Sequence, residues 1–171
     1  MMIVRFHYII IKGSVFLIIR RAESNDLDDI NRLLLQVLTI HHESRPDLFK
    51  DGVKKYTDNE LLDIINDNSR PIFVAESDGK VLGYAFCIFQ QHINNNILTD
   101  IKTLYIDDLC VDETARGQHI GSKLYHFVLD YAKQNGFYNV TLNVWSCNQN
   151  ALKFYESLGL TAQKIGMEKI L

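Results

Sequence analysis

The sequence predicts a mixed α/β fold built as one domain. The hydrophobic period switches several times between the 3.6-residue repeat of an amphipathic helix and the two-residue repeat of a strand, which is typical of this class. The length of 171 residues corresponds to about one domain with one hydrophobic core. Because no internal repeat, linker or run of like charges divides the chain, we expect residues 1–171 to form a single unit.

The amino terminus is strongly apolar and predicts strands. Its two apolar runs are Val4–Ile11 and Val15–Arg20, separated by a lysine, a glycine and a serine. Neither run approaches the ~18–20 residues that cross a membrane, and the segment lacks a good signal-peptide cleavage site. Residues 1–17 are therefore either an extra strand of the sheet or residues upstream of a native start near Ser14.

Two helices are predicted next. Apolar residues recur at three- and four-residue steps over Leu27–Leu38, with Ser24 or Asn25 as the candidate N-cap. The segment 41–52 contains a proline and a glycine and predicts a loop. A capping box at Thr57–Glu60 predicts the start of the second helix, because each side chain can accept a hydrogen bond from the other residue's amide.

The remaining elements alternate between strands and helices. An Asp-Gly pair at 78–79 predicts a tight hairpin between two strands. Glycines at 136 and 159 are expected to end the two helices, since glycine readily adopts the left-handed conformation found there. The predicted strands are Ile72–Glu76, Val81–Phe89, Thr103–Val111, Val140–Val144 and Thr161–Leu171, and the predicted helices are Ile120–Ala132 and Asn150–Leu158.

The composition argues against several classes of protein. With 18 basic and 21 acidic residues the net charge is −3, which gives no overall attraction to nucleic acid or to anionic lipid. Hydrophobic residues make up 47% and charged residues 23%, as in globular proteins rather than disordered ones. Three cysteines without a C-x-x-C pair predict neither a disulfide framework nor a zinc cluster. We therefore expect a cytoplasmic protein without a bound metal.

The region after the strand Thr103–Val111 has the pattern of a phosphate site. A short turn leads into a helix, whose first amides have no partner within the helix and whose dipole favours an anion. Gly117 and Gly121 let a diphosphate approach the backbone, and Arg116 adds a positive charge. The alternative is an ordinary helix start with two incidental glycines.

The glycine spacing excludes two common nucleotide motifs. A P-loop has four residues between its glycines and then Lys before Ser or Thr, whereas three residues separate Gly117 from Gly121 and the order here is Ser122-Lys123. The dinucleotide fingerprint G-x-G-x-x-G is also absent from the sequence. The pattern therefore favours neither a P-loop kinase nor a dehydrogenase.

Two segments together carry a more specific pattern. Residues 116–121 read Arg-Gly-Gln-His-Ile-Gly, and residues 148–159 read Asn-Gln-Asn-Ala-Leu-Lys-Phe-Tyr-Glu-Ser-Leu-Gly. They resemble the two signatures of the GNAT superfamily of N-acetyltransferases, an acetyl-CoA loop of the form Gln/Arg-x-x-Gly-x-Gly/Ala and a helix carrying Asn, Ala, Phe-Tyr and a final glycine. The chain departs from the first signature at His119, where the family usually has glycine.

The resemblance implies a fold and a co-substrate. The fold would be a central, mostly antiparallel sheet with one splayed parallel pair, flanked by about four helices. The co-substrate would be acetyl-CoA, its diphosphate on the helix-start amides and its pantetheine arm paired with a strand edge. The residues that the resemblance assigns to acetyl-CoA are Leu109, Cys110, Val111, Arg116, Gly117, Gln118, His119, Ile120, Gly121, Ser122 and Asn148.

The resemblance also implies catalytic groups. Tyr155 matches the general acid that protonates the leaving thiolate, although its helical spacing alone indicates a core aromatic. A backbone amide near Leu109 or Cys110 would donate to the developing oxyanion. Asp107 matches an acidic residue that faces the cleft in diamine acetyltransferases and is the candidate general base, acting directly or through a water. Strand alternation sends Asp108 to the opposite face, so at most one of the two would serve, and the alternative for both is a solvated carboxylate at the rim.

The predicted loop around residues 41–45, His-His-Glu-Ser-Arg, lies where this family covers the acceptor pocket. It either contacts the acceptor or is an ordinary surface loop, and no third metal ligand is spaced to join the two histidines. A covalent acetyl-cysteine route is not expected, because no histidine base lies beside Cys110 or Cys147 in the sequence.

The expected function is transfer of an acetyl group from acetyl-CoA to a primary amine, either a small polyamine-like amine or a peptide amine, by direct attack in a ternary complex. One alternative is an acyl-CoA sensor without catalysis, which would have no need for an acid at Tyr155. Another is a toxin that acetylates aminoacyl-tRNA, which would need a basic groove that the charge of −3 disfavours. We expect no nucleic-acid or membrane partner; members of the family often form homodimers, and the apolar first segment offers an interface strand.

Overall fold

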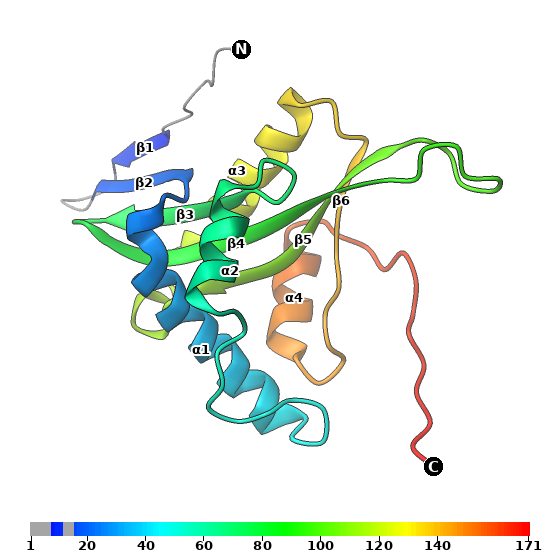
Figure 1. The fold of residues 1–171 in the computed structure, drawn as a ribbon, viewed down its shortest axis with the longest axis horizontal. Coiled ribbons are helices and arrows are strands. Elements are labelled where there is room, and N and C mark those ends of the chain that lie inside the picture. Colours follow the sequence, from blue (N-terminus) through cyan, green and yellow to red (C-terminus); the bar gives the residue numbers. More distant parts are fainter. Residues whose placement is uncertain (1–7, 12–15) are drawn as a thin grey trace.

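The computed structural model describes residues 8–11 and 16–171, so that residues 4–7 and 15 of the first two predicted strands lie outside it. Its centre is a six-stranded sheet with the strand order β1-β2-β3-β4-β5-β6 (Figure 1). Neighbouring strands are antiparallel except β5 and β6, which are parallel, and this confirms the mostly antiparallel sheet with one parallel pair. The strands are β1 (Tyr8–Ile11), β2 (Phe16–Arg21), β3 (Ile72–Ser77), β4 (Lys80–Gln91), β5 (Lys102–Val111) and β6 (Asn139–Leu142).

Helices cover both faces of the sheet. The helices α1 (Leu27–Ser44) and α2 (Asp58–Asn66) lie on one face, and α3 (Ile120–Gln134) lies on the other (Figure 1). The short helix α4 (Gln149–Ser157) follows β6 and lies beside β5. None of the helices in the described part of the chain is long and apolar enough to cross a membrane.

Each face of the sheet has its own hydrophobic cluster. Residues such as Leu104 and Ile106 of β5 pack against Leu124 and Val128 of α3. On the opposite face the cluster joins the sheet to α1 and α2, and its members include Ile30, Leu33, Leu61, Ile65, Val74, Tyr84, Phe86 and Cys110. Burying apolar side chains in both clusters stabilises the fold by about 0.8 kcal/mol per methylene group, and this holds the sheet between its two helix layers.

Most of the predicted turn and cap signals are confirmed. The amide of Glu60 donates to Thr57 Oγ1 at 3.3 Å, and the amide of Thr57 donates to Glu60 Oε2 at 2.7 Å, which is the predicted capping box of α2. Asp78 and Gly79 have φ of 50° and 76° and join β3 to β4 in a two-residue hairpin. Gly136 ends α3 in the left-handed conformation, with φ of 69°.

The predicted cap of the first helix is wrong. Ser24 and Asn25 lie within a short 3₁₀ turn, and α1 begins only after Asp26. The reason is a set of hydrogen bonds to Asp26. The amide of Glu23 donates to Asp26 Oδ2 at 2.8 Å, and the Arg20 guanidinium donates to both Asp26 oxygens at 2.7 and 2.8 Å. These bonds hold Asp26 at the helix start, so neither Ser24 nor Asn25 caps α1.

Two further sequence predictions are wrong. Residues 41–44, expected in a loop, form the last turn of α1, because the first helix breaker is Pro46 and the amide of Arg45 still donates to the His41 carbonyl at 2.8 Å. The expected strand Thr161–Leu171 does not form. Strand β6 is only four residues long and offers little edge to pair with, so the final segment leaves the sheet with Ile165 and Met167 exposed (Figure 1).

Candidate active site

The parallel strands β5 and β6 separate halfway along β5. Their pairing runs from Thr103 with Asn139 to Ile106 with Leu142, where β6 ends. Strand β5 continues to Val111 and pairs beyond this point only with β4 among the described strands. The expected pantetheine edge, Leu109–Val111, therefore lies on a strand edge that β6 leaves free.

The side chain of Cys110 points away from this edge. Its sulfur is buried on the α1 face, 3.7 Å from the Leu33 carbonyl oxygen, and burial raises the pKa of its thiol to about 12. A neutral, buried thiol is a poor nucleophile, so Cys110 is not a candidate for an acetyl-cysteine intermediate. Only the backbone of Cys110 is therefore available to a ligand at the free edge.

The turn before α3 presents unpaired backbone amides. The first helical bond runs from the Lys123 amide to the His119 carbonyl at 3.1 Å. Within the described part of the chain, the amides of residues 117–122 donate to no backbone or side-chain acceptor. The helix start is therefore uncapped, and its dipole adds to a local preference for an anion.

Two residues of this turn have left-handed backbone. Gly117 has φ of 79°, which glycine adopts without strain. His119, the N-cap of α3, has φ of 60° and makes no side-chain capping bond. A position with positive φ is one where glycine has the least strain, which explains why the family usually has glycine where this chain has His119. The His119 side chain is exposed and leaves its own backbone accessible.

Gly121 is needed for close packing. A Cβ atom at this position would lie 3.2 Å from Phe154 Cζ and 3.5 Å from Val111 Cγ2. The first turn of α3 therefore sits directly against α4 and the end of β5, and this contact brings the two sequence signatures together in space.

A buried ion pair fixes the approach to the turn. Asp112 lies between β5 and the turn, and its carboxylate binds the Arg32 guanidinium of α1 and accepts hydrogen bonds from the Thr114 amide at 3.0 Å and hydroxyl at 2.8 Å. Burial alone would raise the pKa of Asp112, but these hydrogen bonds and Arg32 outweigh it and lower the pKa to about 2. Arg32 and Asp112 are absent from the predicted site and act on it by holding the turn.

The prediction that Asp107 and Asp108 point to opposite faces is wrong. In the β4–β5 register Phe86 pairs with Asp108 and the next residue, Cys87, pairs with Ile106, so Asp107 is the extra residue of a β-bulge. A bulge interrupts the two-residue alternation, and both carboxylates approach the same group, the Lys55 ammonium, at 3.1 Å from Asp107 and 3.5 Å from Asp108. The site therefore contains a carboxylate pair rather than one acid.

The two carboxylates have different surroundings. The Asp107 side chain is 29% exposed, whereas that of Asp108 is 11% exposed and accepts a hydrogen bond from the Tyr84 hydroxyl at 3.2 Å. Burial raises the pKa of Asp108, although Lys55 and Tyr84 oppose this. The pKa of Lys55 is raised, because the two carboxylates outweigh the effect of burial, so Lys55 is an ammonium ion.

Tyr155 lies within the electrostatic reach of Asp108, the more buried of the two carboxylates. Its ring contacts Tyr125 and Phe154, with centroids 6.5 and 5.1 Å away. Burial raises the pKa of the Tyr155 phenol, and the charge of Asp108 raises it further. The phenol is therefore protonated at neutral pH and able to donate a proton, which the role expected of Tyr155 requires.

Asn148 has a structural role at the start of α4. Its Oδ1 accepts a hydrogen bond from the Ala151 amide at 3.0 Å, which makes it the N-cap of that helix. Its side-chain NH₂ group is not used by this bond. The neighbouring Asn143 donates to the Tyr105 hydroxyl at 3.1 Å and ties the end of β6 to β5.

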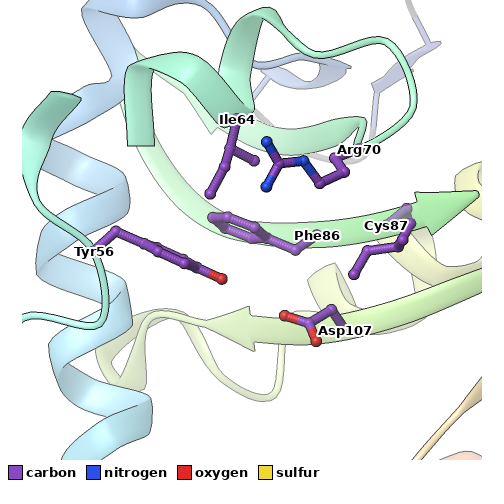
Figure 2. A pocket seen from close by; sticks show the side chains of 7 residues that line it. Tyr56, Ile64, Arg70, Phe86, Cys87 and Asp107 are labelled. Carbon is purple, nitrogen blue, oxygen red and sulfur yellow. The ribbon is translucent and has the colours of Figure 1, made fainter. Parts of the chain in front are cut away.

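A small pocket opens beside the carboxylate pair on the α2 face of the sheet. It has a volume of about 50 Å³. Figure 2 shows the ring of Phe86 between the Arg70 guanidinium on one side and the Tyr56 hydroxyl and the Asp107 carboxylate on the other. Ile64, Cys87 and Ile88 complete the lining.

His41, in the last turn of α1, lies within the electrostatic reach of Asp108 and Lys55. Its ring centre lies 4.9 Å from that of Phe49, with the two rings tilted, and Phe49 meets the Trp145 ring edge-on at 5.4 Å. The end of α1 therefore contacts the β6–α4 connection through three rings. Burial lowers the pKa of His41, although the charge of Asp108 opposes this. In the described part of the chain no three His, Cys, Asp or Glu side chains are grouped to hold a metal ion.

Several residues at this site were not predicted from the sequence. They are Lys55, Tyr56, Tyr84, Phe86 and Asp108 as a partner of Asp107. Lys55 and Tyr56 precede a capping box, and nothing in their local pattern indicates a site. Tyr84 and Phe86 follow ordinary strand alternation and share their face with Asp108, which pairs with Phe86. Only the bulge, which the sequence does not signal, brings Asp107 to the same face.

Comparison with known proteins places the chain in a family. The sequence pattern of the acetyltransferase (GNAT) family matches residues 34–160. A curated relative, the glucosamine 6-phosphate N-acetyltransferase of Arabidopsis thaliana, is 26% identical over 119 residues, 70% of each chain. An uncharacterised N-acetyltransferase of Archaeoglobus fulgidus is 30% identical over 151 residues, covering 86% of this chain and 95% of that one.

Solved structures agree with this placement. A mutant Bacillus halodurans protein superposes with a TM-score of 0.86 at 30% identity, covering 90% of this chain and 98% of that one. An aminoglycoside acetyltransferase from a soil metagenome, 24% identical, shares the fold with a TM-score of 0.69, covering 91% and 96%. The chain belongs to the acetyltransferase (GNAT) family, whose members use acetyl-CoA.

Proposed function

We propose that this protein is an acetyl-CoA-dependent N-acetyltransferase that acetylates a primary amine by direct attack in a ternary complex. The observation that carries the proposal is the uncapped turn at residues 117–122 beside a strand edge left free by β6. A diphosphate needs several convergent N–H donors, and a pantetheine arm needs an unpaired strand edge. Family membership supports the same co-substrate.

The residues present fit the diphosphate and the arm. The amides of Gly117, Gln118, His119, Ile120, Gly121 and Ser122 would bind the diphosphate, with Arg116 at the exposed rim. The backbone of Leu109, Cys110 and Val111 would pair with the pantetheine amides, and the free NH₂ group of Asn148 could join them from α4. Acetyl-CoA, when bound, supplies the activated acetyl group.

The transfer itself needs three things from the chain. The acceptor ammonium must lose a proton, and the carboxylate pair of Asp107 and Asp108 would take it. Burial raises the pKa of Asp108, which favours Asp108 over Asp107 as the base. The developing oxyanion would accept a hydrogen bond from a β5 amide near Leu109 or Cys110. The leaving thiolate would take the proton of the Tyr155 phenol, whose pKa is raised by burial and by the charge of Asp108.

The test is release of coenzyme A thiol by purified protein given acetyl-CoA and a panel of amines. The panel should include N-α-acetyl-lysine methylamide, spermidine, a peptide with a free amino terminus, an aminoacyl-tRNA, and glucosamine 6-phosphate, which the plant relative's name gives as its substrate. We expect turnover with at least one cationic amine. Tight acetyl-CoA binding without turnover of any amine would instead favour a sensor, and acetylation confined to aminoacyl-tRNA would favour the toxin-type activity.

A further inference from the structure

The ammonium group of Lys55 lies in a cage of two carboxylates and two aromatic rings. Its Nζ is 3.1 Å from Asp107 Oδ2 and 3.5 Å from Asp108 Oδ2. The same atom lies 5.4 Å from the centre of the Tyr56 ring and 5.9 Å from the centre of the Phe86 ring. We call these four surrounding side chains the carboxylate–aromatic cage.

The cage suits a primary alkylammonium ion. An ammonium offers three N–H donors, enough for both carboxylates, while aromatic faces attract a cation through the ring quadrupole. The rings are held rigidly, because Tyr56 stacks on Phe86 at 6.2 Å and Phe86 meets Tyr84 edge-on at 5.0 Å. A neutral aromatic amine would make neither the ion pairs nor the cation–π contacts.

Lys55 occupies the cage from a segment outside the helices and strands. It lies in the connection between α1 and α2, one residue after Lys54, whose ammonium instead pairs with Asp58 at the surface at 2.7 Å. The Lys55 side chain is 36% exposed, although its ammonium lies beside the largely buried Asp108 and Phe86. A surface segment thus reaches inward with a flexible stem, which can also turn out to solvent.

The cage lies where the reaction needs an amine. Asp108, one of its walls, is also the carboxylate whose charge acts on the Tyr155 phenol. The pocket of about 50 Å³ shares Tyr56, Phe86 and Asp107 with the cage and gives the space next to it (Figure 2). A nitrogen in the position of Lys55 Nζ is therefore next to both the proposed base and the free end of β5.

We propose that the carboxylate–aromatic cage binds the acceptor's ammonium group, that the acceptor is an unbranched primary alkylamine, and that Lys55 occupies this site until the acceptor displaces it. The proposal rests on the proposed acetyl transfer and names its acceptor class. Lys55 is the internal competitor of the acceptor, so the apparent affinity for the amine is the intrinsic affinity multiplied by the fraction of molecules with an empty cage. One ion pair and the ring contacts together correspond to about a tenfold preference for the occupied cage.

The experiment compares Lys55→Met with Lys54→Met and Lys55→Arg. Lys55→Met removes the charge and keeps the length of the stem, whereas Lys55→Arg keeps a cation. Calorimetry with N-α-acetyl-lysine methylamide, in the presence of coenzyme A, gives Kd, and thiol release from acetyl-CoA gives KM for the same amine. We expect Lys55→Met to lower both about tenfold, Lys54→Met to change neither, and Lys55→Arg to lower neither. Aniline, which is uncharged at neutral pH, should bind no better to Lys55→Met than to the wild type.

The outcomes separate this inference from the proposed function. If the wild type turns over the amine and Lys55→Met has an unchanged or higher Kd and KM, the cage is not the ammonium site, while the acetyltransferase proposal stands. If no amine is turned over but Lys55→Met binds the alkylamine about tenfold more tightly, the cage stands as an alkylammonium site and the proposed function fails. Thermal melts of all three variants show whether each is folded under the conditions of the assay.

Discussion

Replacing Tyr155 with Phe tests the proposed general acid by removing one oxygen atom. The hydroxyl donates to none of the described residues, so its loss leaves no partner unsatisfied, and the free energy of unfolding should change by less than about 0.5 kcal/mol. Burial and the charge of Asp108 raise the pKa of the phenol, so it is fully protonated during the assay but has little driving force for donation. We therefore expect a loss of about 10–1000-fold in kcat, or about 1.4 to 4 kcal/mol of barrier.

The assay measures the initial rate of thiol release from acetyl-CoA at a saturating concentration of the best amine. The exposed Cys147 thiol is present in every sample, so a blank without amine is subtracted. Tyr125→Phe is the matched control, because Tyr125 is a buried neighbouring tyrosine, 6.5 Å from the Tyr155 ring, whose pKa is raised by burial alone. Acetyl-CoA affinity should stay within about twofold in both variants. A Tyr155→Phe variant as fast as the wild type would refute the role given to this phenol.

Three other predictions concern the turn and the carboxylates. His119→Gly should raise the free energy of unfolding by about 0.5–1 kcal/mol and Tm by a few degrees. It removes the strain of a left-handed backbone, about 1–2 kcal/mol, at a cost of about 0.5–1 kcal/mol in chain entropy. His119→Ala should show no such gain in a thermal melt. The pKa of Asp112 is lowered to about 2 in the folded protein, so its contribution of about 2 kcal/mol to the free energy of unfolding is present above pH 5 and is lost as the pH falls towards 2. Urea titrations from pH 6 to 3 should show that this free energy falls more steeply in the wild type than in Asp112→Asn, and equal slopes would contradict the prediction. Asp108→Asn should lower kcat/KM at least tenfold. It should also remove the acid limb of the pH–rate profile, which lies above the usual carboxyl pKa because the raised pKa of Asp108 makes the base ionise at higher pH. An unchanged pH–rate profile would exclude Asp108 as the base.

Much of the fold follows from local sequence patterns. The alternation of helical and strand periods predicts the order of elements through α4, and the capping box at Thr57 and the Asp78-Gly79 hairpin are confirmed because their bonds are local. Local rules fail where distant residues decide. Arg20 holds Asp26 and moves the start of α1, and the final segment has too little edge to pair with once β6 ends at Leu142.

The candidate site also contains some features that local sequence predicts and others that depend on distant contacts. The turn at residues 117–122 is predictable, because unpaired amides follow from any helix start and the glycines mark the close approach. The carboxylate pair is only half predictable: alternation separates Asp107 from Asp108, and the bulge that reunites them depends on the register against β4. Lys55 is not predictable at all, since its place depends on the path of the chain between α1 and α2.

Amide NMR can show directly whether the free N–H groups before α3 bind the diphosphate of coenzyme A. Coenzyme A and pantetheine are compared, because pantetheine has the arm without the diphosphate. We predict that coenzyme A shifts the amide resonances of residues 117–122 and of Leu109–Val111, whereas pantetheine shifts only the second group. Unshifted resonances at residues 117–122 in saturating coenzyme A would show that these amides do not bind the diphosphate.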